Sequence, residues 1–349
     1  MKYLRACLAI AGAFSLVSMT EPARAEPLKN IVLVHGAWVD ASGWKPVYEI
    51  LTRQGFHVSM VQEPETSFAD DVTAAKRILD LQDGPTLLVG HSYGGSIITE
   101  AGVHPNVAGL VYVAAHAPDV GEDEAALGRK TPSVLAKTEG AIKVTPDKFT
   151  YLDPVQFPKL FAPDLPRERA EFVARSQVLA AAQVFSTPLT AAAWKTKPSW
   201  GIVAGSDHII NPDLERWYYE RAKSHMTVIP GASHSVYESH AKEVAAVITN
   251  AARSVQQTRR RHVEHDGLAD GARRTCLTGS FALAATGPDQ DISHVDVHER
   301  RYREQDSNDL AATSRSARCP HRSRIQAGAR QDRRSPGRDA ADGSRGSAG

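Results

Sequence analysis

The sequence of 349 residues predicts an α/β fold in which a mainly parallel sheet carries helices on both faces. Short apolar runs alternate along the chain with stretches of helical periodicity, and this alternation is typical of strand–helix–strand units. One interruption, residues 118–197, is too long for a plain crossover and predicts a lid over one edge of the sheet. The composition changes at about residue 254, so we expect the folded domain to span residues 26–253.

The individual elements follow from these runs. Continuous apolar stretches indicate buried parallel strands, which we expect at 30–35, 56–61, 86–90, 108–114, 200–205 and 226–230. Amphipathic stretches predict helices at about 43–54, 68–81, 94–103, 213–223 and 238–252. In the last of these, Val244, Val247 and Ile248 have the spacing of a face that packs on the sheet. Inside the lid, the run Arg167–Ala182 has helical character.

The third predicted strand leads directly into Gly-His-Ser-Tyr-Gly at residues 90–94. This G-x-S-x-G pattern between a strand and a helix is typical of a nucleophile elbow, a strained turn that exposes the serine above the sheet. A side chain at Gly90 or Gly94 would collide with the neighbouring strand or helix, which explains both glycines. Ser92 is therefore the candidate nucleophile, and a glycine-rich turn without chemistry is the alternative.

A serine hydroxyl needs a base to take its proton, and the base needs a third group to hold it. After such an elbow the acid and then the histidine follow in chain order. Asp207 comes directly after the predicted strand 200–205, and His234 lies in the loop after strand 226–230. Both side chains would then reach the edge of the sheet where Ser92 emerges. We expect Asp207 to be the acid and His234 the base.

Other acids and histidines compete for these roles. Asp119 follows the strand at 108–114 and is the main rival acid, whereas Asp213 has the position of a first-turn helix residue. His208 adjoins Asp207 but would point elsewhere from the same turn, and His240 is expected inside the last helix. His91 lies within the elbow and cannot fold back on Ser92, so we interpret it as a packing residue.

Acyl transfer also needs preorganised donors for the oxyanion. The backbone N–H of Tyr93, the residue after the nucleophile, is one expected donor. The loop after the first strand, which begins His35-Gly36-Ala37-Trp38, can supply the other, and Ala37 is the best candidate. We expect His35 to pin this loop as a structural residue.

The lid is expected to line the substrate pocket. The candidate pocket residues of the lid are apolar: Phe157, Phe161, Leu165, Phe172, Val178 and Phe185. Trp38 of the first loop is a further candidate. The histidines are scattered, and a glycine-rich phosphate loop with lysine is missing from the sequence. We therefore predict no metal and no cofactor.

Four motifs together resemble the α/β-hydrolase superfamily: I-V-L-V-H-G-A-W at 31–38, L-L-V-G-H-S-Y-G-G at 87–95, I-V-A-G-S-D at 202–207 and P-G-A-S-H at 230–234. The resemblance covers about residues 28–252. Within the superfamily, the short chain and the H-G-A-W loop are similar to small esterases related to plant methyl esterases and hydroxynitrile lyases. The resemblance implies that Ser92, Asp207 and His234 form a catalytic triad and that Ala37 and Tyr93 form the oxyanion hole.

One departure from that group bears on the reaction. Its hydroxynitrile lyases usually carry a residue other than glycine after the first-loop histidine, together with an active-site lysine. Here the loop is His35-Gly36, and no lysine adjoins His234. The sequence therefore favours hydrolysis of a small-molecule carboxylic ester through an acyl-enzyme. The alternatives are lyase or perhydrolase chemistry on the same site, or a non-catalytic binding protein with this fold.

The first 25 residues predict a cleaved signal peptide. Lys2 and Arg5 precede the apolar stretch 6–19, which is short for a membrane span, and Ala23-Arg24-Ala25 matches a cleavage site. The mature chain would begin at Glu26 and be periplasmic or secreted. A retained anchor is the alternative, and we expect no stable membrane anchor.

The tail, residues 254–349, differs from the domain in composition. It contains 17 arginines, 13 acidic residues and no lysine, and its apolar periodicity fades. Such a segment cannot bury enough apolar surface to offset its chain entropy, so we predict disorder and a dispensable extension. The alternative is a basic arm that binds nucleic acid or acidic lipid. The formal net charge of the whole chain, +1, gives no reason to expect a nucleic-acid partner. The oligomeric state does not follow from the sequence.

Overall fold

The structure is a computed structural model that describes the backbone of residues 27–279 and the side chains of residues 27–263. The predicted signal peptide lies outside the described residues, as does the tail beyond residue 279.

A six-stranded sheet forms the centre of the fold. Its strands are β1 (Asn30–Val34), β2 (His57–Met60), β3 (Thr86–Ser92), β4 (Val107–Ala115), β8 (Ser199–Ala204) and β9 (His225–Ile229). They lie in the order β2-β1-β3-β4-β8-β9, and every neighbouring pair is parallel. The predicted parallel sheet is confirmed, with bounds that differ by one or two residues at most strand ends.

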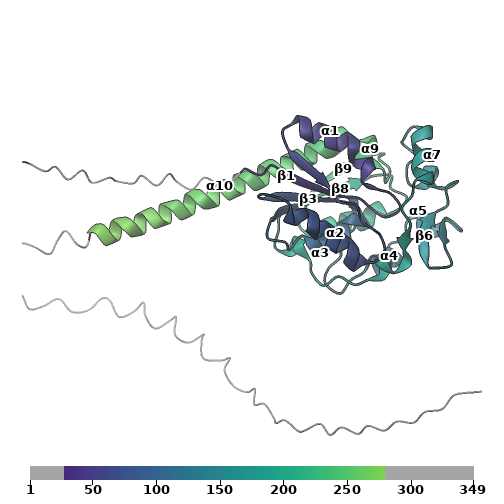
Figure 1. The fold of residues 1–349 in the computed structure, drawn as a ribbon, viewed down its shortest axis with the longest axis horizontal. Coiled ribbons are helices and arrows are strands. Elements are labelled where there is room, and N and C mark those ends of the chain that lie inside the picture. The colour runs from purple at the N-terminus through teal and green to yellow at the C-terminus, as the bar shows by residue number, and fades with distance from the viewer. Residues whose placement is uncertain (1–26, 280–349) are drawn as a thin grey trace, which may run out of the picture. The chain divides into compact units, whose positions relative to one another are not determined.

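Helices cover both faces of this sheet (Figure 1). On one face, α1 (Lys45–Arg53), α9 (Val236–Ser239) and α10 (Ala241–Gly279) share a buried core with the strands. On the other face, α2 (Phe68–Asp80), α3 (Gly94–Ala101) and α8 (Pro212–Arg221) contribute to a second core. The helix starts follow from local chemistry: the Ser67 side chain accepts the Asp70 N–H before α2, and Asn211 accepts the Asp213 N–H before α8.

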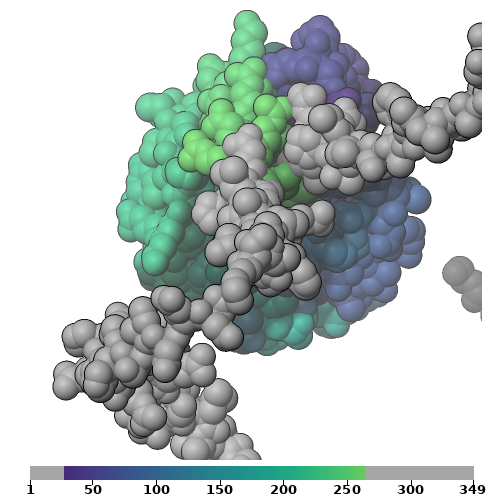
Figure 2. All heavy atoms as spheres, turned by 90° about the vertical axis from the view of Figure 1, so that its left-hand side faces the viewer, coloured from purple at the N-terminus to yellow at the C-terminus, as the bar shows by residue number. Residues whose placement is uncertain are grey.

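The last helix extends beyond the predicted end near residue 252. Val255 continues the apolar stripe of α10 and is only 4% exposed, and the N–H of Leu28 donates to the side chain of Gln256. Glutamine and arginine are good helix formers, so the polar composition of residues 256–261 is compatible with a helix. Figure 2 views the domain from the side toward which α10 extends in Figure 1. The domain boundary at residue 253 therefore cuts through a helix.

The segment between β4 and β8 forms the predicted lid. It contains the helices α4 (Glu124–Lys130), α5 (Val134–Lys137), α6 (Phe157–Leu160) and α7 (Arg167–Arg175), the strands β5 (Ile142–Val144), β6 (Phe149–Leu152) and β7 (Ala180–Ala181), and the 3₁₀ turns η2 (Ala182–Ser186) and η3 (Ala193–Lys195). A further 3₁₀ turn, η1 (Ala41–Trp44), precedes α1. The three lid strands form a small antiparallel sheet.

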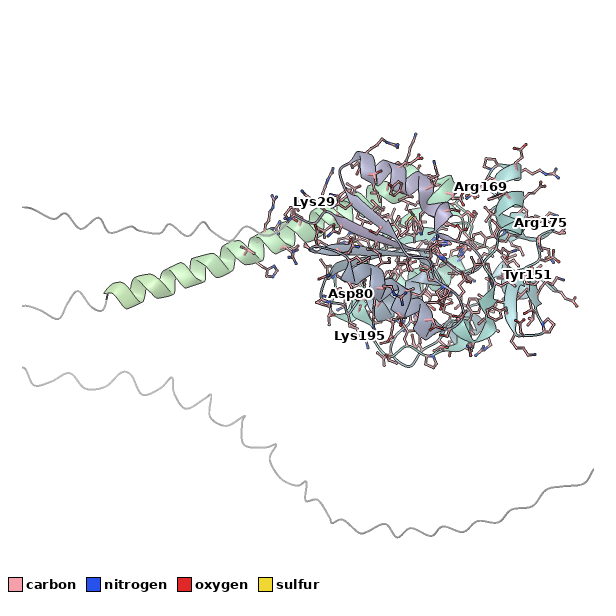
Figure 3. The ribbon with its side chains drawn as sticks, in the orientation of Figure 1. Lys29, Asp80, Tyr151, Arg169, Arg175 and Lys195 are labelled. Carbon is pink, nitrogen blue, oxygen red and sulfur yellow. The ribbon has the colours of Figure 1, made fainter. Side chains whose placement is uncertain are left out.

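The lid also corrects the helix expected at Arg167–Ala182. The helix ends at Arg175, because Ala180 and Ala181 pair with β6 as a strand. Arg169 of α7 donates to Glu238 of α9 over 2.7 Å, which ties the lid to the main domain. Figure 3 shows Arg169, Arg175 and Tyr151 at this end of the domain. Among the described helices, none is long and apolar enough to span a bilayer.

Candidate active site

The turn between β3 and α3 holds Ser92 in a strained conformation. Its φ of 54° is in the left-handed region, which a side chain other than glycine rarely adopts. The neighbouring glycines allow the turn to pack: a Cβ at Gly90 would lie 2.5 Å from the carbonyl oxygen of Gly94, and a Cβ at Gly94 would collide with the carbonyl oxygen of His35. The expected elbow geometry is therefore present, with the Ser92 side chain at the C-terminal edge of the sheet.

His234 lies between Ser92 and Asp207, within hydrogen-bond distance of both side chains. His234 Nε2 is 2.8 Å from Ser92 Oγ, and His234 Nδ1 is 2.6 Å from Asp207 Oδ2. All three side chains are buried, and Ser92 is 7% exposed. The other carboxylate oxygen of Asp207 accepts the N–H groups of Ile209 and Ile210, which fixes its orientation. The arrangement allows His234 to take a proton from Ser92 while Asp207 holds the ring.

The rival residues lie elsewhere. Asp119 pairs with Lys195 over 2.5 Å. Lys195 is labelled in Figure 3, on the outside of the domain. His208 is near the carbonyl oxygen of Lys159, at 3.3 Å. His240 is 2.9 Å from Ser239 Oγ, and it lies between α9 and α10 and not inside the last helix, because α9 ends at Ser239. Asp213 occupies the first turn of α8, as expected.

Buried groups surround the base and the acid. The ring of His91 packs against that of His234, and the edge of Phe161 meets the same ring from another side, with centroids 4.6 and 4.7 Å away. Glu215 of α8 accepts the N–H of Ala204 just before Asp207. Burial, and next the charge of Asp207, raises the pKa of Glu215 well above its ordinary value. A protonated Glu215 adds no negative charge beside Asp207.

The two expected oxyanion donors border the same space as Ser92. Ala37 and Tyr93 both line the cavity in front of Ser92. Within the described residues, the N–H of neither one has a backbone acceptor. The first loop passes very close to the elbow, since a Cβ at Gly36 would lie 2.6 Å from the Cβ of Ser92. Both amides are therefore free to donate to an oxygen that develops charge beside Ser92.

A cluster of buried acids behind this loop was not predicted from the sequence. His35 Nδ1 is 2.9 Å from the carbonyl oxygen of Gly36, and its Nε2 contacts the Glu63 carboxylate. Burial alone would lower the pKa of His35, but Glu63 and then Glu65 raise it to about 9. This placement matches the structural role expected of His35. The only sign of this cluster in the sequence is the number of acidic residues in the stretch 63–71. Because acidic side chains are more often exposed, that sign does not indicate a buried cluster.

A cavity of about 590 Å³ opens in front of Ser92. Trp38 and Phe185 line it, as expected, and their rings lie 5.4 Å apart. Phe157 and Phe161 do not line it: their rings stack on each other, 4.6 Å apart, in the core behind His234. Other lining residues come from α4, α5, the loop before α8 and the start of α8, and include Leu135, Ala136, Ile209, Ile210 and Leu214.

Three further pocket candidates are also placed elsewhere. Phe172 is 61% exposed on α7, and Leu165 and Val178 are absent from the cavity wall. Leu165 packs against the core that the lid shares with the main domain, and Phe172 lies on the surface of α7. Of the pocket candidates taken from the sequence, Trp38 and Phe185 line this cavity and the others do not.

One acid in the cavity wall was missed. Glu124 of α4 accepts a hydrogen bond from Ser96 Oγ, and its Oε2 lies 3.5 Å from His116 Nε2. Burial raises the pKa of Glu124 to about 8 and lowers that of His116 to about 3. Both of these side chains are therefore uncharged near neutral pH, and Arg129 also lines the cavity. Among the residues that the structure describes, no cluster of histidine, cysteine and acidic side chains has the geometry of a metal site.

Comparison with known families agrees with this fold. The alpha/beta hydrolase family model matches residues 31–247, which is more than half of the chain. The protein belongs to the alpha/beta hydrolase family.

Individual relatives are esterases. Over 130 residues the chain is 32% identical to the carbendazim hydrolyzing esterase of a Nocardioides species, an alignment that covers 32% of this chain and 53% of that enzyme. The matched region thus spans about half of that relative's length. Among solved structures, a pyrethroid hydrolase from Sphingobium faniae JZ-2 is similar, with a TM-score of 0.55 and 23% sequence identity. The match covers 65% of this chain and 98% of the pyrethroid hydrolase chain. A methylesterase from Arabidopsis is 19% identical with a TM-score of 0.53, and the match covers 65% of this chain and 99% of the methylesterase chain. At these identities the structural similarity shows a common fold.

Proposed function

We propose that the protein is a serine esterase that cleaves carboxylic esters through an acyl-enzyme. The observation that carries this proposal is the position of His234, which lies within 2.8 Å of Ser92 Oγ and within 2.6 Å of Asp207 Oδ2 beside an open cavity. Family membership and the esterase relative support the same reaction class.

The reaction proceeds in two halves. Ser92 Oγ attacks the ester carbonyl carbon while His234 Nε2 takes the hydroxyl proton, and the N–H groups of Ala37 and Tyr93 hold the oxyanion. The intermediate collapses to an acyl-serine, and His234 gives its proton to the departing alcohol. Water then gives a proton to His234 and attacks the acyl carbon, which releases the acid and restores the Ser92 hydroxyl. Asp207 stabilises the imidazolium in both halves.

The cavity indicates the kind of ester. Its volume of about 590 Å³ is that of a site for a drug-sized molecule, and Trp38, Phe185 and the aliphatic residues of α5 and α8 make it mainly apolar. We expect uncharged esters with an aromatic or branched group to react faster than short aliphatic esters of the same leaving alcohol.

A burst experiment tests the reaction class. The purified enzyme, mixed with an excess of a short p-nitrophenyl ester, should release p-nitrophenolate in a burst followed by a slower steady state. Ser92→Ala should abolish both phases. Ser206→Ala, which changes an exposed serine at the same edge of the sheet, should leave both intact. An inactive wild-type enzyme would instead favour a binding protein on the same fold.

We also propose that residues 1–25 direct export and are removed. The positive residues Lys2 and Arg5, the apolar stretch after them and the site Ala23-Arg24-Ala25 support this proposal. Expression in a bacterial host followed by mass spectrometry of the periplasmic fraction tests it. A chain that begins at Glu26 is expected, and an intact amino terminus in the cytosol would contradict export.

A further inference from the structure

The two proposed oxyanion donors come from loops that are far apart in the sequence. Ala37 follows β1, and Tyr93 follows β3. A donor contributes to catalysis only if its N–H points at the place where the oxyanion forms, and errors in position weaken it. Some structural element must therefore set the separation of the two amides.

A continuous chain of hydrogen bonds joins the two loops. The hydroxyl of Tyr93 donates to Asp71 Oδ2 over 2.7 Å, and the N–H of Glu65 donates to Asp71 Oδ1 over 2.8 Å. The carboxylate of Glu65 then accepts the N–H of Trp38 over 3.3 Å, one residue after Ala37. The chain thus runs from the side chain of one donor residue to the backbone next to the other.

The chain is buried and its backbone is strained. Tyr93, Asp71 and Glu65 are 1%, 0% and 0% exposed. Trp38 and Glu65 have φ values of 65° and 53°, in the left-handed region. Such conformations persist only where the surrounding structure holds them in place, and they gather at functional sites. Asp71 and Glu65 do not line the cavity, so they cannot touch a substrate there.

We propose that the Tyr93 hydroxyl, Asp71 and Glu65 form an oxyanion clamp that fixes the separation of the Ala37 and Tyr93 amides. The inference rests on the proposed esterase function. In it, Asp71 and Glu65 are positioning residues, and the Tyr93 side chain has a role separate from that of its backbone amide.

A purely structural role and a positioning role predict different kinetics. Loss of a buried hydrogen bond lowers stability in either case. Displacement of an oxyanion donor weakens binding of the transition state more than binding of the substrate, so it lowers kcat and leaves KM nearly unchanged. Complete removal of a donor costs about 10²–10³ in kcat, so displacement should cost about tenfold.

The experiment uses Tyr93→Phe, Asp71→Asn, the double variant and Tyr112→Phe. Tyr112 of β4 is a matched control, because it is a buried tyrosine whose hydroxyl also has a hydrogen-bond partner. That partner is Thr99 Oγ1 of α3, at 3.0 Å. The measurements are made at pH 8, where Asp71 is ionised, since burial raises its pKa to about 6. Active enzyme is counted by labelling with a fluorophosphonate, which corrects for any unfolded fraction. A trifluoromethyl ketone serves as the transition-state probe, because its adduct with Ser92 carries an oxyanion.

We expect kcat to fall about tenfold in Tyr93→Phe and in Asp71→Asn, with KM changed less than about twofold and affinity for the ketone weakened by the same factor as kcat. The double variant should be no worse than either single variant, because both break the same chain. Tyr112→Phe should keep the wild-type kcat. An unchanged kcat in Tyr93→Phe, an equal loss in Tyr112→Phe, or losses that multiply in the double variant would overturn the clamp while the esterase function stands. A wild-type enzyme that neither hydrolyses esters nor reacts with the fluorophosphonate would overturn both.

Discussion

The imidazole of His91 packs against that of His234, and its Nε2 lies 2.9 Å from the carbonyl oxygen of His234. Burial, and next the neighbouring His234, lowers the pKa of His91 well below its ordinary value, so the ring is neutral and can donate one N–H. His91, the residue before Ser92, thus holds the backbone of His234, which is proposed as the base that activates Ser92.

This relationship predicts the effect of His91→Phe. Phenylalanine fills the space of the ring but cannot donate to the carbonyl of His234, so the free energy of unfolding should fall by about 1–2 kcal/mol. kcat should fall about tenfold, because His234 is less well oriented. Urea denaturation and steady-state kinetics measure the two effects. His225→Phe, on the exposed start of β9, is the control and should change neither. A normal kcat in His91→Phe would reduce His91 to a packing residue.

A second prediction concerns the proposed triad as a unit. Ser92→Ala and His234→Ala should each lower kcat by about 10⁴ or more, and the double variant should be little worse, because nucleophile and base act in one step. Asp207→Asn should cost about 10²–10⁴. Asp119→Asn should cost almost nothing, since Asp119 pairs with Lys195. A large loss in Asp119→Asn, or high activity in His234→Ala, would reject these assignments.

A third prediction uses the pKa of Glu124, which burial raises from 4.5 to about 8. Between these values the folded protein binds more protons at this site than the unfolded chain does. The contribution of Glu124 to stability is therefore complete below about pH 4.5 and is lost as pH rises through about 8. His116 and Ser96 contact the carboxyl, Asp123 adds negative charge, and Arg129 borders the same cavity.

The test compares Glu124→Gln with the wild-type protein at pH 5 and pH 8.5. Glutamine cannot ionise, so the free energy of unfolding of the variant should rise relative to wild type by at least about 1 kcal/mol between these pH values. Urea denaturation at each pH measures the difference. Glu139→Gln, on an exposed part of the lid, should show no such change. A difference that is the same at both pH values would mean that Glu124 does not titrate in this range.

A fourth prediction concerns the length of α10. A chain that ends at Val263 keeps Val255 and Gln256 and should retain full activity and a normal melting temperature. A chain that ends at Arg253 loses the buried Val255 side chain, and its free energy of unfolding should fall by about 1–3 kcal/mol. Thermal denaturation and an ester assay compare the two. Loss of activity in the chain that ends at Val263 would make residues 264–349 part of the catalytic unit.

The features that local sequence specifies were predictable. The elbow at Ser92 follows from two glycines between a strand and a helix, and the parallel sheet follows from its apolar runs. Asp207 and His234 can be identified from the sequence because each follows a strand, and the carboxyl ends of parallel strands meet at the same edge of the sheet. These inferences need only short windows of sequence and one rule of chain order.

Features that depend on contacts between distant segments were not predictable. The strands β5, β6 and β7 have only two to four residues, too few for periodicity to show. Phe157, Phe161 and Phe185 are all phenylalanines of the lid, and only the folding of the lid decides which of them line the cavity. Composition therefore could not distinguish core residues from cavity residues. Burial of Asp71 depends on Tyr93, and burial of Glu124 depends on Ser96 and His116, which come from other elements.

Covalent labelling shows whether Ser92 is a nucleophile that His234 activates. The enzyme is incubated with a fluorophosphonate, and the modified peptide is identified by mass spectrometry. We expect one phosphonyl group per chain, on Ser92, and a labelling rate at least about 10²-fold lower in His234→Ala. Absence of labelling, modification of another residue, or an undiminished rate in His234→Ala would contradict it.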